Sequence, residues 1–293
     1  MAPRTWTSRL TALGRIDRRW LYLALLIALV TTVLLRPTLS SAPSPFTQPV
    51  FAAVEALAPG APVLVTMEYS PGSAPEIEPM AQALTRHLLW RGARPVYVSL
   101  WPEGNNMFQR LRVSVLEPEF ADRVEGRDWL ALGYKAGRAM AINSLRQDLR
   151  SMYTQDLRGV PLDSCPAVAE IHDLGDFALI VALSAGTPGL QEWILYAGDP
   201  TGVPLVGGCT GVGMPEFLAY FPGQLVGLIG GLKGAAEYET ALASAYPDRS
   251  LPRPATIGMG PQTVAHALIL LFLVLGNLGV VASWAVQRRG GRR

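Results

Sequence analysis

The sequence predicts an α/β fold with a Rossmann-like, doubly wound and mostly parallel sheet of about five strands, flanked by two transmembrane helices. The middle of the chain alternates short apolar runs with segments of helical periodicity, which is typical of strands covered by helices on both faces. A long apolar segment lies near each end of the chain. The composition agrees, because 49% of the 293 residues are hydrophobic, 16% are charged, and the mean hydropathy is +0.24.

The same composition excludes several classes of protein. Few charges and many apolar residues exclude a disordered chain, and 2 cysteines exclude a disulfide scaffold or a Cys-rich zinc module. A net charge of +2 provides no broad basic field for nucleic acid. We therefore expect no nucleic-acid partner, and the membrane bilayer is the first partner that the composition predicts.

The two apolar segments, residues 20–35 and 264–286, are predicted membrane spans. The first has 16 uncharged residues, which reach about 24 Å as a helix, and flanking Arg19 and Arg36 can extend it toward the headgroups. The second has 23 residues and reaches about 34 Å. The first segment also resembles a signal peptide, but no A-x-A cleavage site follows it, which favours an uncleaved signal anchor.

Arginine distribution predicts the orientation of the two spans. Five arginines precede the first span and four follow the second, whereas three flank the spans on the other side. We therefore expect a plasma-membrane protein with both termini in the cytoplasm and the middle of the chain outside it. The chain has 23 arginines and only 2 lysines, a bias that GC-rich codons produce and that indicates a prokaryote.

The sequence divides into seven predicted segments. They are a basic tail at 1–19, the span at 20–35, a linker and lead-in at 36–61, the α/β domain at 62–247, a linker at 248–263, the span at 264–286 and a basic tail at 287–293.

Within the domain, strands and helices are predicted from periodicity and turn residues. The predicted strands are residues 62–69, 93–101, 128–134, 177–184 and 203–209. The predicted helices are residues 76–91, 107–116, 136–149, 188–196 and 223–246. Ligands of such folds bind beyond the carboxyl ends of the strands, so the loops there are the expected site.

Ser184 is the one candidate for a catalytic nucleophile. It lies in A-L-S-A-G, a relaxed form of the nucleophile elbow at the end of a predicted strand. Asp199 can be the acid of a triad, but the only histidine that follows Ser184 is His266, at the start of the second span. The alternative interpretation is a tight turn from strand to helix, and this is favoured.

Polar residues at the predicted strand ends form a candidate pocket for a small polar or anionic ligand. They are Glu68, Ser70, Ser73, Glu103, Lys135, Ser184, Thr187 and Thr210. The alternative is that the hydroxyls cap helices and that Lys135 is solvated. No nucleotide-binding motif or metal-ligand spacing occurs, so we expect no cofactor and no metal.

The two cysteines and a glycine-rich predicted helix each have two possible interpretations. Cys165 and Cys209 lie in the predicted external domain, so they form either a disulfide or two buried thiols. The predicted helix 223–246 carries a strip of small residues, which packs on the sheet or contacts a second subunit. The glycines of this strip are Gly223, Gly227, Gly230, Gly231 and Gly234.

Three sequence phrases, EYSPGSAPEIEPM, SAGTPG and GQLVGLIGGLKGAAEYE, precede a span that contains LGN at 275–277. With these, the chain resembles an uncharacterised prokaryotic family of two-span membrane proteins with an extramembrane α/β domain. The resemblance covers most of residues 62–280. It implies the architecture and assigns no catalytic residue.

Three functions are consistent with these observations. The first is a non-enzymatic accessory or interaction subunit of a membrane complex, with other membrane subunits or a second copy as partner. The second is a sensor that binds a small polar ligand at the strand ends. The third is a serine hydrolase-like enzyme that uses Ser184. The absence of a catalytic constellation favours a protein that is not an enzyme.

Overall fold

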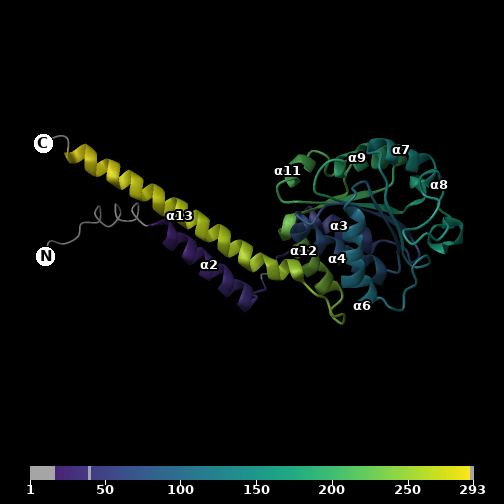
Figure 1. Cartoon of the computed structure of the whole chain (residues 1–293), viewed down its shortest axis with the longest axis horizontal. Coiled ribbons are helices and arrows are strands. Elements are labelled where there is room, and N and C mark those ends of the chain that lie inside the picture. The colour runs from purple at the N-terminus through teal and green to yellow at the C-terminus, as the bar shows by residue number, and fades with distance from the viewer. Residues whose placement is uncertain (1–16, 39–40, 291–293) are drawn as a thin grey trace. The chain divides into compact units, whose positions relative to one another are not determined.

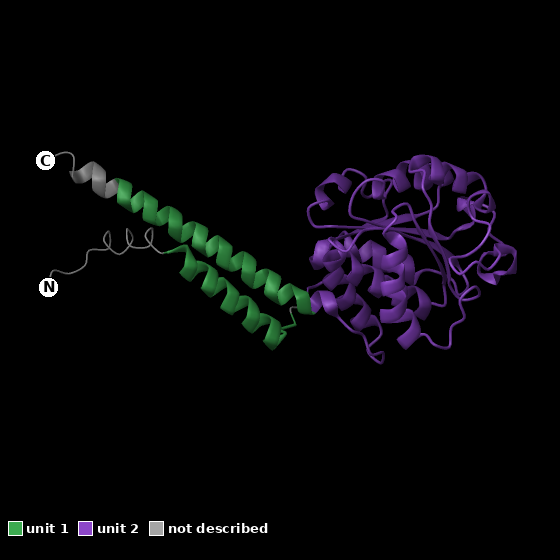
Figure 2. Cartoon of the chain, in the orientation of Figure 1, with its two compact units in different colours: residues 1–39, 257–293 green, residues 40–256 purple. Residues whose placement is uncertain are grey.

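The computed structural model describes residues 17–38 and 41–290, with side chains up to residue 284. The predicted basic tails lie largely outside these residues. The chain divides into two compact units, Met1–Leu39 with Ile257–Arg293, and Ser40–Thr256 (Figure 2).

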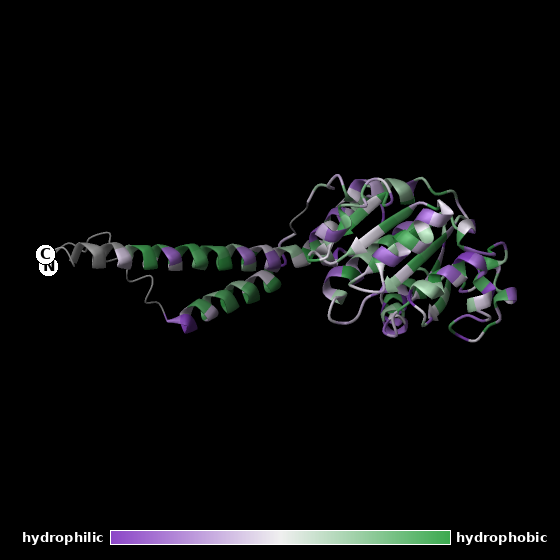
Figure 3. Ribbon diagram, turned by 90° about the horizontal axis from the view of Figure 1, so that it is seen from above, coloured by the Kyte–Doolittle hydropathy of each residue, from purple (hydrophilic) through white to green (hydrophobic). Residues whose placement is uncertain are grey.

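The first unit contains two apolar helices, α2 (Arg18–Leu35) and most of α13 (Pro254–Gly290). Both are long and apolar enough to cross a membrane, and only 6% of the most apolar window in each is buried. Figure 3 shows apolar residues along both helices. Buried core helices of soluble domains lack this exposure. Helix α13 begins ten residues before the predicted span, at a proline, so the prediction of a linker through residue 263 is wrong.

The second unit contains a sheet of six parallel strands in the order β3-β2-β1-β4-β5-β6. The strands are β1 (Pro62–Glu68), β2 (Arg94–Ser99), β3 (Leu130–Tyr134), β4 (Leu179–Ser184), β5 (Leu205–Cys209) and β6 (Gly227–Gly230). This order is that of a doubly wound sheet whose direction of winding reverses between β1 and β4. The predicted α/β fold is confirmed, with one strand more than expected.

Helices cover both faces of the sheet. Figure 1 shows α3, α4 and α12 on one side and α7, α9 and α11 on the other. Their bounds are α3 (Thr47–Glu55), α4 (Ala74–Trp90), α5 (Gly104–Leu111), α6 (Glu117–Glu119), α7 (Ala139–Gln147), α8 (Leu149–Met152), α9 (Leu190–Trp193), α10 (Asp199–Thr201), α11 (Met214–Phe217) and α12 (Gly231–Ala245). Two π-helices, η1 (Arg112–Leu116) and η5 (Ile194–Gly198), follow α5 and α9. Three 3-10 turns are η2 (Leu162–Ser164), η3 (Pro166–Val168) and η4 (Leu174–Asp176).

Helix α3 lies in the stretch that the sequence assigns to a linker, and that prediction is wrong. Val50 and Val54 are completely buried. The helix packs against β6 and α12, and a Cβ added to Gly227 of β6 would lie 2.7 Å from the Val50 amide nitrogen. The Pro/Ser-rich composition before α3 is typical of a linker, so the short apolar face of this helix was not recognised in the sequence.

The prediction of one helix over 223–246 is also wrong, so its glycines do not form a strip on one helix face. Gly227 and Gly230 belong to β6, and Gly231 begins α12 with a positive φ of 60°. A Cβ on Gly231 would approach Gly211 Cα to 2.9 Å, and one on Gly234 would meet Ile229 at 3.1 Å. These small residues therefore allow close approach within the domain, and the predicted partner contact loses its geometric basis.

Cys165 and Cys209 are both free and buried. The structure therefore has no disulfide between Cys165 and Cys209. The two thiols are part of the apolar core on the α7–α9 face of the sheet. Of the two interpretations of the cysteine pair, the structure agrees with buried thiols.

A candidate ligand pocket at the carboxyl edge of the sheet

Glu68 and Ser184 end the two strands at which the winding direction of the sheet reverses. They are paired in register, so their side chains lie on the same face of the sheet. Both side chains are buried, at 0% and 2% exposure. The sequence prediction therefore correctly brings these two residues to one edge, but neither is open to solvent.

The Glu68 carboxyl is enclosed in the core. Thr66 Oγ1 lies 2.6 Å from Glu68 Oε2, and the Leu100 amide donates to Oε1 at 3.1 Å. No cationic side chain pairs with Glu68 among the residues the structure describes. Loss of hydration on burial raises the pKa of Glu68 to about 8, although these hydrogen bonds oppose the rise. Glu68 is therefore mostly a neutral acid at pH 7.

Trp101 occupies the crevice where a doubly wound fold usually binds its ligand. Its indole Nε1 donates to the Pro188 carbonyl at 2.6 Å, so the loop after β2 reaches the loop after β4. The ring packs over Gly186, where an added Cβ would lie 3.4 Å from the nearest ring atom, an ordinary van der Waals contact. The usual site between β1 and β4 is therefore closed.

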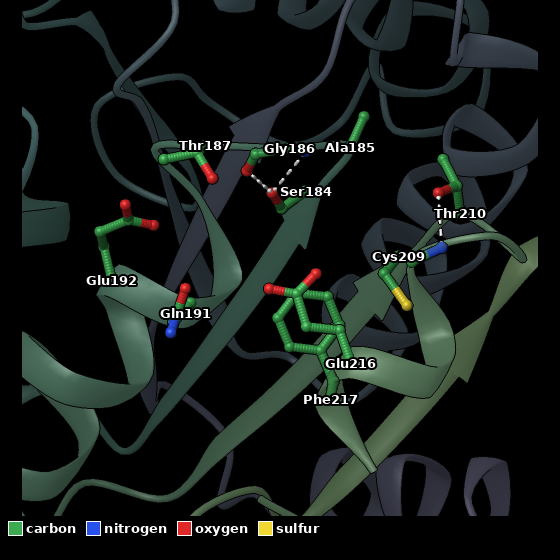
Figure 4. Close-up of a pocket in the computed structure, with 11 residues that line it drawn as sticks. Ser184, Ala185, Gly186, Thr187, Gln191, Glu192, Cys209, Thr210, Glu216 and Phe217 are labelled. Atoms are coloured by element: carbon green, nitrogen blue, oxygen red, sulfur yellow. Dashed lines mark hydrogen bonds between the residues drawn. The ribbon is translucent and has the colours of Figure 1, made fainter. Parts of the chain in front are cut away.

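An open pocket lies one strand further along, at the carboxyl ends of β4 and β5 (Figure 4). Its volume is about 60 Å³. The β4 end and the loop to α9 contribute one wall, and the β5 end with α11 contributes the other. The lining residues are Ser184, Ala185, Gly186, Thr187, Gln191, Glu192, Cys209, Thr210, Gly213, Glu216 and Phe217.

Ser184 lines this pocket but is not arranged as a nucleophile. Its Oγ donates to the Gly186 carbonyl at 2.8 Å, and no histidine contacts it in the described part of the chain. His172 precedes β4 and thus lies toward the opposite end of the strand, and Asp199 accepts a hydrogen bond from Gln224. The hydroxyl orders the strand-to-helix turn, as the alternative interpretation of the sequence expects.

Among the residues that the structure describes, two acidic side chains and no basic one line the pocket. Glu192 accepts from the Gly189 amide at 2.7 Å and so caps the first turn of α9. Glu216 lies on α11, with its side chain at the pocket (Figure 4). Burial, together with the charges of Glu76 and Glu216, raises the pKa of the Cys209 thiol to about 12. The field at this site is therefore negative, which disfavours the predicted anionic ligand.

Of the predicted ligand residues, Ser184, Thr187 and Thr210 line the pocket. The other five do not. Ser73 Oγ donates to the Ser70 carbonyl, Glu103 is exposed before α5, and the Lys135 ammonium lies 5.1 Å from the centre of the Tyr153 ring. Sequence reasoning missed Gln191, Glu192, Glu216 and Phe217. The G-x-x-E spacing from Gly189 to Glu192 is a capping signal that identifies one of them.

A second polar cluster joins α3, α4 and α12, but it is closed to ligands. His87 has 0% exposure and contacts Tyr238 Oη at 2.7 Å and Glu55 Oε2 at 2.8 Å. Burial lowers the pKa of His87 to about 4, so the imidazole is neutral and donates from Nε2 to the Glu55 carboxylate. Because Tyr238 is fully buried as well, this cluster ties helices together and presents no reactive group. Within the described residues, no cluster of three metal-ligating side chains occurs.

No known family, curated protein or solved structure matches the chain significantly.

Proposed function

We propose that the chain is a membrane-anchored binding protein, not an enzyme, whose α/β domain recognises a small polar ligand at the carboxyl ends of β4 and β5. The observation that carries this proposal is the open pocket, which combines hydroxyl, amide and carboxylate groups. Its volume of about 60 Å³ is well below the ~300–1,000 Å³ of sites for drug-sized ligands. The ligand is thus a small molecule or the end of a longer one.

A panel of small probes tests this binding function on the full chain in detergent micelles. The probes are ethylammonium, acetate, inorganic phosphate and glycerol, and the readout is the NMR signal of 13C-methyl-labelled threonines. We expect at least one probe to shift the signals of Thr187 and Thr210, while the remote Thr85 and Thr201 stay unchanged. If no probe shifts Thr187 or Thr210, the proposed function is wrong.

The proposal includes the plasma membrane and an orientation with both termini in the cytoplasm. The two apolar helices and the nine arginines of the terminal segments support it. A reporter enzyme that works only outside the cytoplasm, fused after Arg293, is expected to be inactive. An active reporter would contradict the orientation and leave the binding function untouched.

An interaction subunit is the second candidate function. Val212 and Leu218, on the segment after β5 that also lines the pocket, are 93% and 40% exposed. Apolar exposure beside the pocket favours a protein partner there. The lysine probe of the experiment below tests this candidate.

A further inference from the structure

The pocket at the ends of β4 and β5 has the charge pattern of a cation site. Glu192 and Glu216 both line it, and neither forms an ion pair within the described part of the chain. No lysine, arginine or histidine of the described ranges, 17–38 and 41–284, lines the pocket. Glu76, which accepts from the Gly211 amide at 2.7 Å, adds a third negative charge near Cys209. A cation entering the pocket would therefore meet uncompensated negative charge.

The remaining lining suits an alkyl group and a compact donor. Phe217 provides an apolar wall, and the Cys209 thiol, 1% exposed, lines the pocket without a hydrogen-bond partner among the described residues. The side chains of Thr187, Thr210 and Gln191 offer neutral oxygens. An ammonium group has three donors and no acceptor, which matches a site composed of acceptors.

Size and ligand count disfavour an aromatic cation and a divalent metal. An engineered cavity that encloses benzene has a volume of ~150 Å³, whereas this pocket has about 60 Å³. A benzene-sized aromatic group is therefore too large to be enclosed. A divalent metal prefers several charged ligands, and no group of three candidate ligands occurs in the described residues.

We propose that this pocket binds a primary alkylammonium group, with Glu216 and Glu192 as the charged acceptors. This inference rests on the proposed binding function and specifies its ligand class. The group belongs either to a small free amine or to a lysine side chain of a partner protein. Val212 lies within the lining segment and Leu218 directly follows it, and they are 93% and 40% exposed. A lysine within a peptide would therefore gain apolar contacts that a free amine lacks.

Titration of the full chain in micelles with ethylammonium, Nα-acetyl-lysine methylamide and acetate tests the inference. The readout is again the Thr187 and Thr210 methyl signals. We expect ethylammonium to bind with a dissociation constant in roughly the millimolar range, as a ligand of three heavy atoms allows. Glu216→Gln is expected to weaken binding about tenfold, since a charge-assisted contact is lost. Glu103→Gln, at an exposed site of the same edge, is the matched control.

Gln191→Lys provides a second variant that does not remove an acidic group. It places an ammonium beside the pocket and is expected to abolish ethylammonium binding. A native-like threonine methyl spectrum of each variant shows that it has folded.

The outcomes identify the source of the amine and distinguish failure of the ammonium inference from failure of the binding function. Binding of ethylammonium alone supports a small free amine, whereas tighter binding of the lysine probe supports a partner lysine. If acetate or another probe shifts the threonines and both amines do not, the ammonium inference is overturned while the binding function stands. Equal losses in Glu216→Gln and Glu103→Gln also overturn it. If nothing binds, both proposals fail.

Discussion

Glu68→Gln is expected to raise the free energy of unfolding at pH 9 by about 4 kcal/mol and to leave it nearly unchanged at pH 4. The folded-state pKa of Glu68 is raised from 4.5 to about 8 by burial. Between these values the folded protein keeps a proton that the unfolded chain has lost. Stability from this group is therefore fully present below pH 4.5 and is lost as the pH rises through 8.

Glutamine suits this position because it resembles the neutral acid. Its carbonyl can accept from the Leu100 amide, and its amide can donate to Thr66 Oγ1. The measurement is unfolding followed by tryptophan fluorescence at several pH values, with Glu103→Gln as control for the loss of one surface charge. Parallel pH dependence of the wild type and Glu68→Gln would show that Glu68 is ionised in the fold.

Glu239→Ala is expected to cost about 3–5 kcal/mol of domain stability, because it leaves buried donors without an acceptor. Glu239 has 1% exposure and accepts from the amides of Ala255 and Thr256 at 2.9 and 2.8 Å. The Thr256 hydroxyl donates to the same carboxylate at 2.7 Å. This one side chain of α12 therefore caps the first turn of α13, inside the α/β unit.

The experiment compares amide hydrogen exchange at residues 255 and 256 in the wild type, Glu239→Ala and Glu239→Gln. Exchange should be fastest in the alanine variant and intermediate in glutamine, which keeps one acceptor oxygen. Lys233→Ala, on the same helix at 65% exposure of its side chain, is the matched control. Unchanged exchange in Glu239→Ala would mean that the carboxylate does not hold the start of α13.

Glu237 of the same helix has an equivalent role for the first segment of the unit in the sequence. Its carboxylate accepts from the Ser44 amide at 3.1 Å and from the Thr47 hydroxyl at 2.7 Å. Burial opposes ionisation, but these hydrogen bonds prevail and lower the pKa of Glu237. Two carboxylates of α12 thus hold the first and last segments of the domain. Both glutamates fall within the predicted helix 223–246, and the sequence pattern assigns no contact to either of them.

Much of the architecture was predictable because hydrophobic patterning depends on local sequence. The apolar run at 177–184 predicted β4, and the 16 and 23 uncharged residues near the ends predicted the two membrane-length helices. Strand β6 was not predictable, since G-L-I-G has too few side chains to show a period. Pairing with β5 and contact with α3 decide its conformation.

For the site, the edge of the sheet and some of its residues could be predicted from the sequence. A doubly wound sheet places Glu68, Ser184 and Thr210 at strand ends, because parallel strands finish at one edge. Which of these ends stays open depends on contacts between distant residues. Trp101 crosses from the loop after β2 to Pro188 and closes the crevice beside β1, so the pocket forms between β4 and β5. That contact joins residues 87 positions apart in the sequence. It depends on how side chains from distant segments pack in the folded domain, so no local sequence pattern predicts it.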